Sequence, residues 1–239
     1  MSFLQKLTAC LFIATQLSAG YQESTIRDLV RLYIPNNPVI LEAGAHFGED
    51  TIKMKEIWPN STVYAFEPHP DNYQRLIQTT RHHDKVFCYP LALSDINGSA
   101  KFYRCRLHEG ASSLLHSAPF KQALYNDQVA ILVQCLTLDE WARQNNVDHI
   151  DFCWLDMEGA ELKMLKESTV ILPTITAIYI EVNFQEFRTE MVQYTDIRNF
   201  FEQHGFEQVW MTPGKTGLPE EEQANALFVR EGVTLQPRS

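Results

Sequence analysis

The sequence is poor in positive charge and has no long uninterrupted apolar segment. Its 30 Asp and Glu residues outnumber 20 Lys and Arg residues, which gives a formal net charge of −10. Such a surface repels phosphate backbones, so we do not expect nucleic acid as the substrate. The apolar run near the N-terminus is too short to span a bilayer, so no stable membrane span is expected.

Paired cysteines are also missing. The chain has five cysteines, an odd number, and no two of them are separated by two residues. This pattern indicates neither a disulfide framework nor a structural zinc site. A reducing, intracellular setting therefore fits best.

The N-terminal segment, residues 1–20, allows two interpretations. Lys6 precedes a mostly apolar run, and the small residues around Ala19 resemble a cleavage site, which together outline a secretory signal peptide. The alternative is a packed helix, because apolar residues between Phe3 and Leu17 recur at helical spacing. The first interpretation predicts an exported protein and the second a cytoplasmic one.

Strand-like and helix-like patterns alternate over residues 21–235, which we expect to form a single domain. Helices are expected at 21–33, 49–58, 70–80, 139–145, 159–167 and 191–204, and Asp139 is expected to cap the fourth of these. Strands are expected at 39–45, 61–67, 86–93, 99–105, 130–138, 150–155, 175–182, 206–211 and 226–230. The alternation predicts an α/β, Rossmann-like fold: a seven-stranded, mostly parallel sheet with helices on both faces and an antiparallel C-terminal edge hairpin.

The clearest ligand signal follows the first core strand, in the stretch ILEAGAHFG at residues 40–48. Gly44 and Gly48 permit a turn in which the backbone approaches a ligand at the carboxyl edge of the sheet. Glu67 ends the second strand, 19 residues after Gly48, where a carboxylate can accept both hydroxyls of a ribose. Taken singly, the glycines could be turn and packing residues, but the combination predicts an adenosine site.

Two side chains near this turn restrict the kind of adenosine ligand. His46 occupies the position where the dinucleotide fingerprint needs its second glycine, and no Gly-Lys-Ser/Thr follows for a phosphate loop. Glu42 would repel phosphate but attract an ammonium group. A ligand with a ribose, a positive amino group and no phosphate meets these conditions, and S-adenosylmethionine is such a ligand.

Several stretches, taken in order, resemble the FkbM family of S-adenosylmethionine-dependent methyltransferases, and together they cover about residues 39–206. They lie at 41–45, 64–68, 92–98, 110–114, 138–140 leading into 150–151 and 156–161, and 180–182. The resemblance implies a class I methyltransferase fold and methyl transfer to oxygen, often a hydroxyl of a sugar, a lipid or a natural product. The residues expected to bind the donor are Glu42, Gly44, His46, Gly48, Glu67, Pro68, Ala92 and Leu93.

One position departs from the family pattern. The family commonly has a lysine two residues before the aspartate of its Asp-x-Glu-Gly element, and Trp154 stands there in this chain. Any role of that lysine is therefore lost or replaced. The acceptor pocket is expected to be shaped by the loops at 106–128 and 212–223, since loops vary without altering the sheet.

The candidate catalytic residues are acids at the ends of the fourth and fifth core strands. Asp156 and Glu181 should face the same crevice, with Asp156 as general base or acceptor-orienting group and Glu181 as its partner. Glu158 is a further candidate, although acids are also favoured at the start of a helix for reasons of stability alone. Ser112 and Ser113, in a serine-rich loop, are expected to bind a small hydroxylated acceptor.

Several alternatives remain open from the sequence. Asp156, Glu158 and Glu181 would suit magnesium, but no histidine–carboxylate spacing supports a tighter site, and we expect no metal. Rival functions are an NAD(P)-dependent oxidoreductase and a binding module of the same fold without activity. Because the methyl donor is made in the cytosol, a cytoplasmic location is expected. The sequence does not indicate an oligomeric state.

Overall fold

The computed structural model describes residues 24–117, 127–186, 188–212 and 223–236. The N-terminal segment 1–20, the first turn of the helix expected from residue 21, and most of the loop at 212–223 lie outside the described residues. So does the middle of the loop at 106–128. Within the described ranges, none of the helices combines the length and the apolar character needed to cross a membrane.

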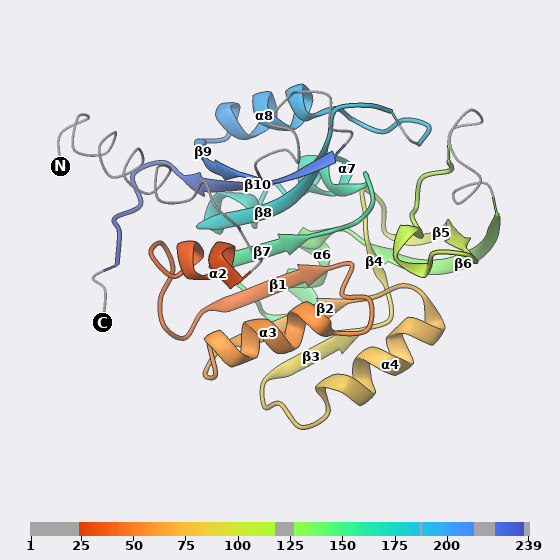
Figure 1. The fold of residues 1–239 in the computed structure, drawn as a ribbon, viewed down its shortest axis with the longest axis horizontal. Helices are drawn as coiled ribbons and strands as arrows, with labels where there is room; N and C mark the ends of the chain where they lie inside the picture. The colour runs from red at the N-terminus through yellow and green to blue at the C-terminus, as the bar shows by residue number, and fades with distance from the viewer. Residues whose placement is uncertain (1–23, 118–126, 187, 213–222, 237–239) are drawn as a thin grey trace.

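The predicted sheet is confirmed. Its seven strands run in the order β3-β2-β1-β7-β8-β10-β9 (Figure 1). Five are parallel to one another, and β10 pairs antiparallel with both β8 and β9, forming the C-terminal edge hairpin. The bounds are β1 (Val39–Ala43), β2 (Thr62–Phe66), β3 (Val86–Tyr89), β7 (Phe152–Leu155), β8 (Ala177–Asn183), β9 (Phe206–Met211) and β10 (Gln223–Arg230).

Helices cover both faces of the sheet, because its strands present apolar side chains alternately to each side. In β7, Phe152 and Trp154 pack with one cluster, while Cys153 and Leu155 pack with the other. The first cluster is covered by α2 (Ser24–Val30) and α3 (Glu49–Ile57), and α4 (Pro70–Thr80) packs beside them. The second is covered by α6 (Leu138–Asn145), α7 (Glu161–Lys166) and α8 (Tyr194–Gln203), with the 3-10 turn η2 (Leu172–Thr174).

The strand expected at 86–93 is two strands in two different sheets, which corrects the prediction. Pro90 follows β3 and cannot donate a hydrogen bond to continue the ladder. The chain then forms β4 (Ala92–Leu93), which pairs with β6 (Gln128–Leu136) in a second sheet of order β4-β6-β5, where β5 is Gly98–Cys105. This small sheet and the 3-10 turn η1 (Glu109–Ala111) lie beyond the carboxyl ends of the parallel strands (Figure 1).

The start of α6 also differs from the prediction. Thr137, not Asp139, is its N-cap and accepts a hydrogen bond from the backbone N–H of Glu140. The carboxylate of Asp139 instead accepts hydrogen bonds from the backbone N–H groups of Val170 and Ile171. Asp139 therefore connects α6 to the turn before η2 through long-range hydrogen bonds, which the local sequence does not predict.

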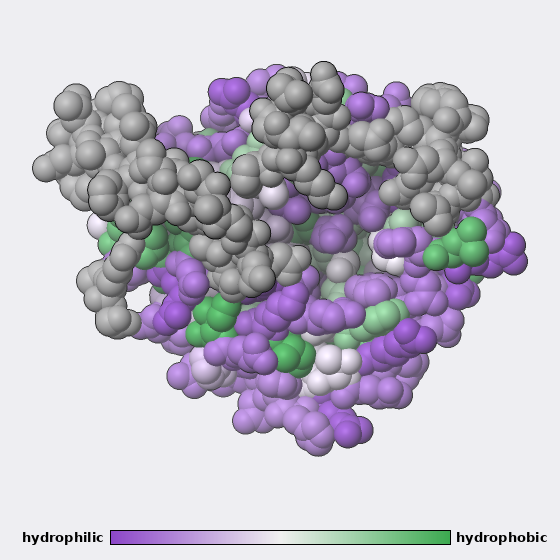
Figure 2. All heavy atoms as spheres, in the orientation of Figure 1, coloured by the Kyte–Doolittle hydropathy of each residue, from purple (hydrophilic) through white to green (hydrophobic). Residues whose placement is uncertain are grey.

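The surface agrees with the composition. Figure 2 shows that hydrophilic side chains cover most of the visible face of the described residues, with apolar side chains only in small separate groups. Large exposed apolar residues are scattered over several elements, and Leu107 and Leu132 are the most exposed near the small sheet. Scattered apolar residues of this kind are ordinary for a protein surface.

Candidate active site

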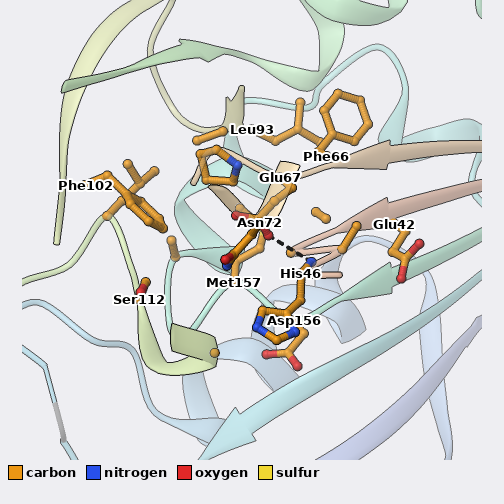
Figure 3. A pocket seen from close by; sticks show the side chains of 18 of the residues that line it. Glu42, His46, Phe66, Glu67, Asn72, Leu93, Phe102, Ser112, Asp156 and Met157 are labelled. Atoms are coloured by element: carbon orange, nitrogen blue, oxygen red, sulfur yellow. Dashed lines mark hydrogen bonds between the residues drawn. The ribbon is translucent and has the colours of Figure 1, made fainter. Parts of the chain in front are cut away.

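A cavity of about 350 Å³ opens where β1, β2 and β7 end, beneath the small sheet (Figure 3). Seven of the eight residues expected to bind the donor line it: Glu42, Gly44, His46, Glu67, Pro68, Ala92 and Leu93. Figure 3 shows Glu42 at one end and Phe102 with Leu93 at the other, with Glu67, His46 and Asp156 between them. The cavity is therefore elongated along the carboxyl edge of the sheet, where ligands of this fold type bind.

The two glycines of the first turn have different roles. Gly44 has a positive φ of 87°, and a Cβ atom there would lie 1.8 Å from the backbone oxygen of Asp156. No side chain fits that space, so Gly44 lets the ends of β1 and β7 meet. Gly48, with φ of 89°, precedes α3 and faces Leu76 of α4. Gly48 does not line the cavity, so its expected contact with the donor is not supported by its position.

Glu67 is fixed by the backbone around it. One carboxylate oxygen accepts a hydrogen bond from the N–H of His46, and the other accepts one from the N–H of His69, each at 2.8 Å (Figure 3 draws the first). Burial raises the pKa of Glu67 to about 7, against the effect of these two bonds. Each oxygen keeps a lone pair, so the side chain can still accept two hydroxyl groups.

Glu42 is buried at the inner end of the cavity and accepts a hydrogen bond from the hydroxyl of Thr51. Burial raises its pKa to about 8; the negative charge of Asp50 adds to this effect, and the positive charge of Arg27 opposes it. A cation bound in the cavity would favour the ionised form of such a carboxyl group. Glu42 is thus suited to hold an ammonium group.

Some cavity residues were missed by the sequence analysis. Asn72, in the first turn of α4, is 2% exposed, and its Oδ1 atom has no hydrogen-bond partner among the residues described. Buried polar atoms are nearly always paired, so this atom suits a ligand that donates a hydrogen bond. Strand β5 and the segment around η1 add Phe102, His108 and Glu109, which no motif marked, and Leu114, the last residue of the stretch at 110–114.

The three predicted catalytic acids come together. One oxygen from each of Asp156, Glu158 and Glu181 lies within 4.8 Å of the others. Asp156 is exposed and lines the cavity, whereas Glu181 is largely buried. Burial, followed by the negative charge of Asp156, raises the pKa of Glu181 to about 10. The protonated form of Glu181 is therefore favoured next to an ionised Asp156.

The turn that carries Glu158 is rigidly held. Glu158 has a positive φ of 56° and forms an ion pair with the buried Arg188 at 2.6 Å. Glu161, which is 1% exposed, accepts hydrogen bonds from the N–H groups of Met157 and Gly159. These bonds shape the backbone between Asp156 and α7, and they explain why α7 begins at residue 161 and not at 159.

The acidic cluster offers oxygen ligands of the kind that magnesium prefers. However, Glu158 is already committed to Arg188, and Glu181 favours its protonated form. The cluster therefore fits a proton-sharing pair of carboxyl groups better than a cation, and we derive no step through a metal.

The hydroxyls of the two serines in the serine-rich loop form hydrogen bonds with backbone groups of the protein. Ser112 lines the cavity, but its hydroxyl accepts a hydrogen bond from the N–H of Cys105 and donates one to the carbonyl of Glu109. Ser113 is 1% exposed, donates to the carbonyl of Glu158 at 3.0 Å and does not line the cavity. The position of Ser113 does not support its expected contact with the acceptor, because its hydroxyl ties the loop to the turn that carries Glu158.

Trp154 points into the core, away from solvent. Its ring is 4% exposed, lies 4.0 Å from the ring of Tyr179, and is covered by the guanidinium of Arg27 at 4.4 Å. Trp154 is paired with Glu42 in the register of β1 and β7. The position that departs from the family pattern therefore lies beneath the inner end of the cavity.

Comparison with known proteins identifies the family of the chain. The model of the methyltransferase FkbM domain matches residues 42–207. The chain is 25% identical over 170 residues to 2-O-methyltransferase NoeI of Sinorhizobium fredii, covering 67% of this chain and 69% of the relative. It is 22% identical over 161 residues to hexuronic acid methyltransferase AglP of Haloferax volcanii, covering 66% and 62%. The chain thus spans about three fifths of the length of AglP.

Solved structures show the same fold at low identity. An rRNA methylase from Streptococcus thermophilus superposes with a TM-score of 0.51 and 11% identity, covering 89% of this chain and 99% of that one. Because the identity is so low, this likeness supports the architecture alone. The match of the family model over residues 42–207 shows that this chain belongs to the FkbM family of S-adenosylmethionine-dependent methyltransferases.

Proposed function

We propose that this protein transfers a methyl group from S-adenosylmethionine to a hydroxyl of a small polyhydroxylated molecule, with a sugar as the best candidate. One observation carries the proposal: the cavity runs from Glu42, past the backbone-fixed carboxylate of Glu67, to the acidic cluster at Asp156. The names of NoeI and AglP, a 2-O-methyltransferase and a hexuronic acid methyltransferase, support a sugar-like acceptor.

The donor fits the residues that are present. Glu67 would accept the ribose hydroxyls, and Glu42 would receive the ammonium group. Ala92 and Leu93 offer an apolar wall at the opposite end. The buried Asn72 would gain the hydrogen-bond donor that it lacks among the described residues. When bound, S-adenosylmethionine supplies a sulfonium methyl group that is open to attack by an oxygen nucleophile.

Asp156 is placed to act on the acceptor. Its side chain lines the cavity at the end of β7, so it can accept a hydrogen bond from the acceptor hydroxyl and take up its proton as the oxygen–carbon bond forms. Glu181, whose pKa is raised by burial and by the charge of Asp156, can share a proton with Asp156 and limit repulsion inside the cluster. Glu158, held by Arg188, keeps the turn in place.

The rival functions have weaker support. A pyrophosphate would have to approach Glu42 and the ring of His46, and both disfavour an NAD(P) ligand. A binding module without activity would not need three carboxyl groups gathered beside the cavity.

The proposal is tested by pairing a binding measurement with an acceptor screen. Calorimetry with S-adenosylhomocysteine and with NAD checks the donor, and labelled S-adenosylmethionine is then incubated with a panel of neutral and acidic glycosides. We expect binding of S-adenosylhomocysteine, no binding of NAD, and label transfer that is lost in Asp156→Asn. Binding of NAD, or label transfer that Asp156→Asn leaves intact, would contradict the proposal.

A further inference from the structure

Helix α2 contributes a buried charge next to the donor cavity, although it precedes the part of the chain that matches the family model, residues 42–207. The side chain of Arg27 is 1% exposed. A buried guanidinium is costly unless acceptors surround it, so its contacts are informative about its role.

Arg27 makes two contacts that point toward the cavity. Its guanidinium donates a hydrogen bond to the carboxylate of Asp50, in the first turn of α3, and it lies over the ring of Trp154 at 4.4 Å. The more exposed Lys53 also donates to that carboxylate, at 3.2 Å. Asp50 lines the cavity, and Trp154 is the register partner of Glu42. Arg27 is therefore joined to the inner end of the cavity from two sides.

That end of the cavity is lined by the carboxyl groups of Glu42 and Asp50, and by that of Glu49 beside them. Two like charges in a partly buried place disfavour each other, and a positive charge beside them relieves the repulsion. The charge of Arg27 lowers the pKa of Glu42, while the charge of Asp50 raises it. The other groups acting on Glu42 are the hydroxyl of Thr51 and the charge of Glu49.

We propose that Arg27 is a positioning residue of the donor site: by holding and neutralising Asp50, it leaves Glu42 as the carboxylate that receives the ammonium group of the donor. The inference rests on the proposed function, in which that ammonium group lies at Glu42. It assigns part of donor recognition to helix α2, and it explains why a buried cation lies under a cavity for a cationic ligand.

The experiment measures Glu42 directly. Arg27→Gln, Arg27→Lys and the control Arg31→Gln are compared, since Arg31 directly follows the last residue of α2 and 46% of its side chain is exposed. In each donor-free protein the pKa of Glu42 is followed by carboxyl-carbon NMR. Affinities for S-adenosylhomocysteine and for 5′-methylthioadenosine, which lacks the amino-acid part, are measured from pH 6 to pH 9.

We expect Arg27→Gln to raise the pKa of Glu42 and to weaken binding of S-adenosylhomocysteine at pH 7 by about 3- to 10-fold, as loss of a nearby opposite charge implies. Binding of 5′-methylthioadenosine should change little. Arg27→Lys should keep the pKa of Glu42 and the affinity for S-adenosylhomocysteine close to the wild-type values, and Arg31→Gln should behave as wild type. Asp50→Asn should shift the pKa of Glu42 downward, which keeps the inference testable if Arg27→Gln does not fold.

The outcomes separate the inference from the function on which it rests. If Arg27→Gln lowers only the melting temperature, and Asp50→Asn leaves the pKa of Glu42 unchanged, Arg27 has a structural role alone. If Glu42→Gln binds S-adenosylhomocysteine as tightly as wild type does, the ammonium group lies elsewhere, and the proposed arrangement of the donor is itself wrong.

Discussion

The proposed donor half of the site takes most of its geometry from the backbone, whereas the proposed acceptor half takes its geometry from side chains of distant segments. In the donor half, at the ends of β1 and β2, two backbone N–H groups fix Glu67, and Gly44 brings the chain against β7. In the acceptor half, at the ends of β7 and β8, Asp156 meets Glu181, and Glu158 depends on Arg188.

This difference has a functional meaning. Members of a family that share one methyl donor need the same binding geometry for it, and backbone contacts can provide that geometry with few side chains. An acceptor site built from side chains and loops can be altered without disturbing the sheet. We therefore expect substitutions in the donor half to impair binding of any adenosyl ligand, and substitutions in the acceptor half to alter turnover.

The largest effect is expected for Asp156→Asn. Loss of a proton-accepting group should lower turnover by about 10²- to 10⁴-fold. Affinity for S-adenosylhomocysteine should stay within about twofold of wild type, since the substitution removes no predicted donor contact. Single-turnover kinetics and calorimetry on the same preparation check this split. A matching loss of donor affinity would mean that the two halves are not separate.

Glu67→Gln should have the next largest effect, on binding. An amide offers one acceptor oxygen in place of two, so the N–H of His46 or of His69 would face an NH₂ group. An unpaired buried donor costs about 1 to 3 kcal/mol, before any loss of ribose contacts is counted. Calorimetry should show weaker binding of both S-adenosylhomocysteine and 5′-methylthioadenosine. Glu42→Gln is the contrast, because it should affect only the ligand that carries the ammonium group.

Glu181→Gln tests the acceptor half through pH. The folded pKa of Glu181 is raised to about 10, so its contribution to stability is fully present below its unfolded pKa and is lost as pH rises toward 10. Gln resembles the protonated form, so the variant should gain stability over wild type by at most about 1.4 kcal/mol per pH unit between pH 6 and pH 9. Urea unfolding measures the gain, and it should be smaller in an Asp156→Asn background. A gain independent of pH would argue against a protonated Glu181.

The smallest effect is expected for the serine-rich loop. Ser113→Ala removes hydrogen bonds to the carbonyl of Glu158 and from the N–H of Leu115, and should lower the free energy of unfolding by about 1 to 3 kcal/mol. Ser112→Ala, at a partly buried site, should cost less. Acceptor KM should change little in either variant if both hydroxyls serve the loop. A large rise in KM for Ser112→Ala alone would return that residue to acceptor binding.

The sequence was most informative where function and local pattern coincide. The strand ends at Glu42, Glu67, Asp156 and Glu181 were predictable, because parallel strands of a buried sheet read as apolar runs that each end at one edge. Seven of the eight residues predicted to bind the donor line the cavity. The exception, Gly48, shows that a glycine in the same motif can serve helix packing.

What the sequence did not reveal depends on contacts between distant segments. Asp139 looked like a helix cap because such residues usually are, but its partners are 31 and 32 residues away. Asn72 looked like an ordinary first-turn residue of a helix. The contact between Arg27 and Asp50 depends on how α2 packs against α3, which the sequence does not show. The end of β3 after Tyr89 was indicated in the sequence by Pro90 alone.

The close passage of Gly44 over Asp156 has a consequence for how this protein can vary. A single hydrogen atom separates the chain that leaves β1 from the carbonyl at which β7 ends, so even one added methyl group must push the two strands apart. The proposed methyl-giving and methyl-accepting sides therefore meet at a backbone contact that no side chain at residue 44 can fit. Diversity of acceptors must then arise from loops farther out, while this crossing stays the same.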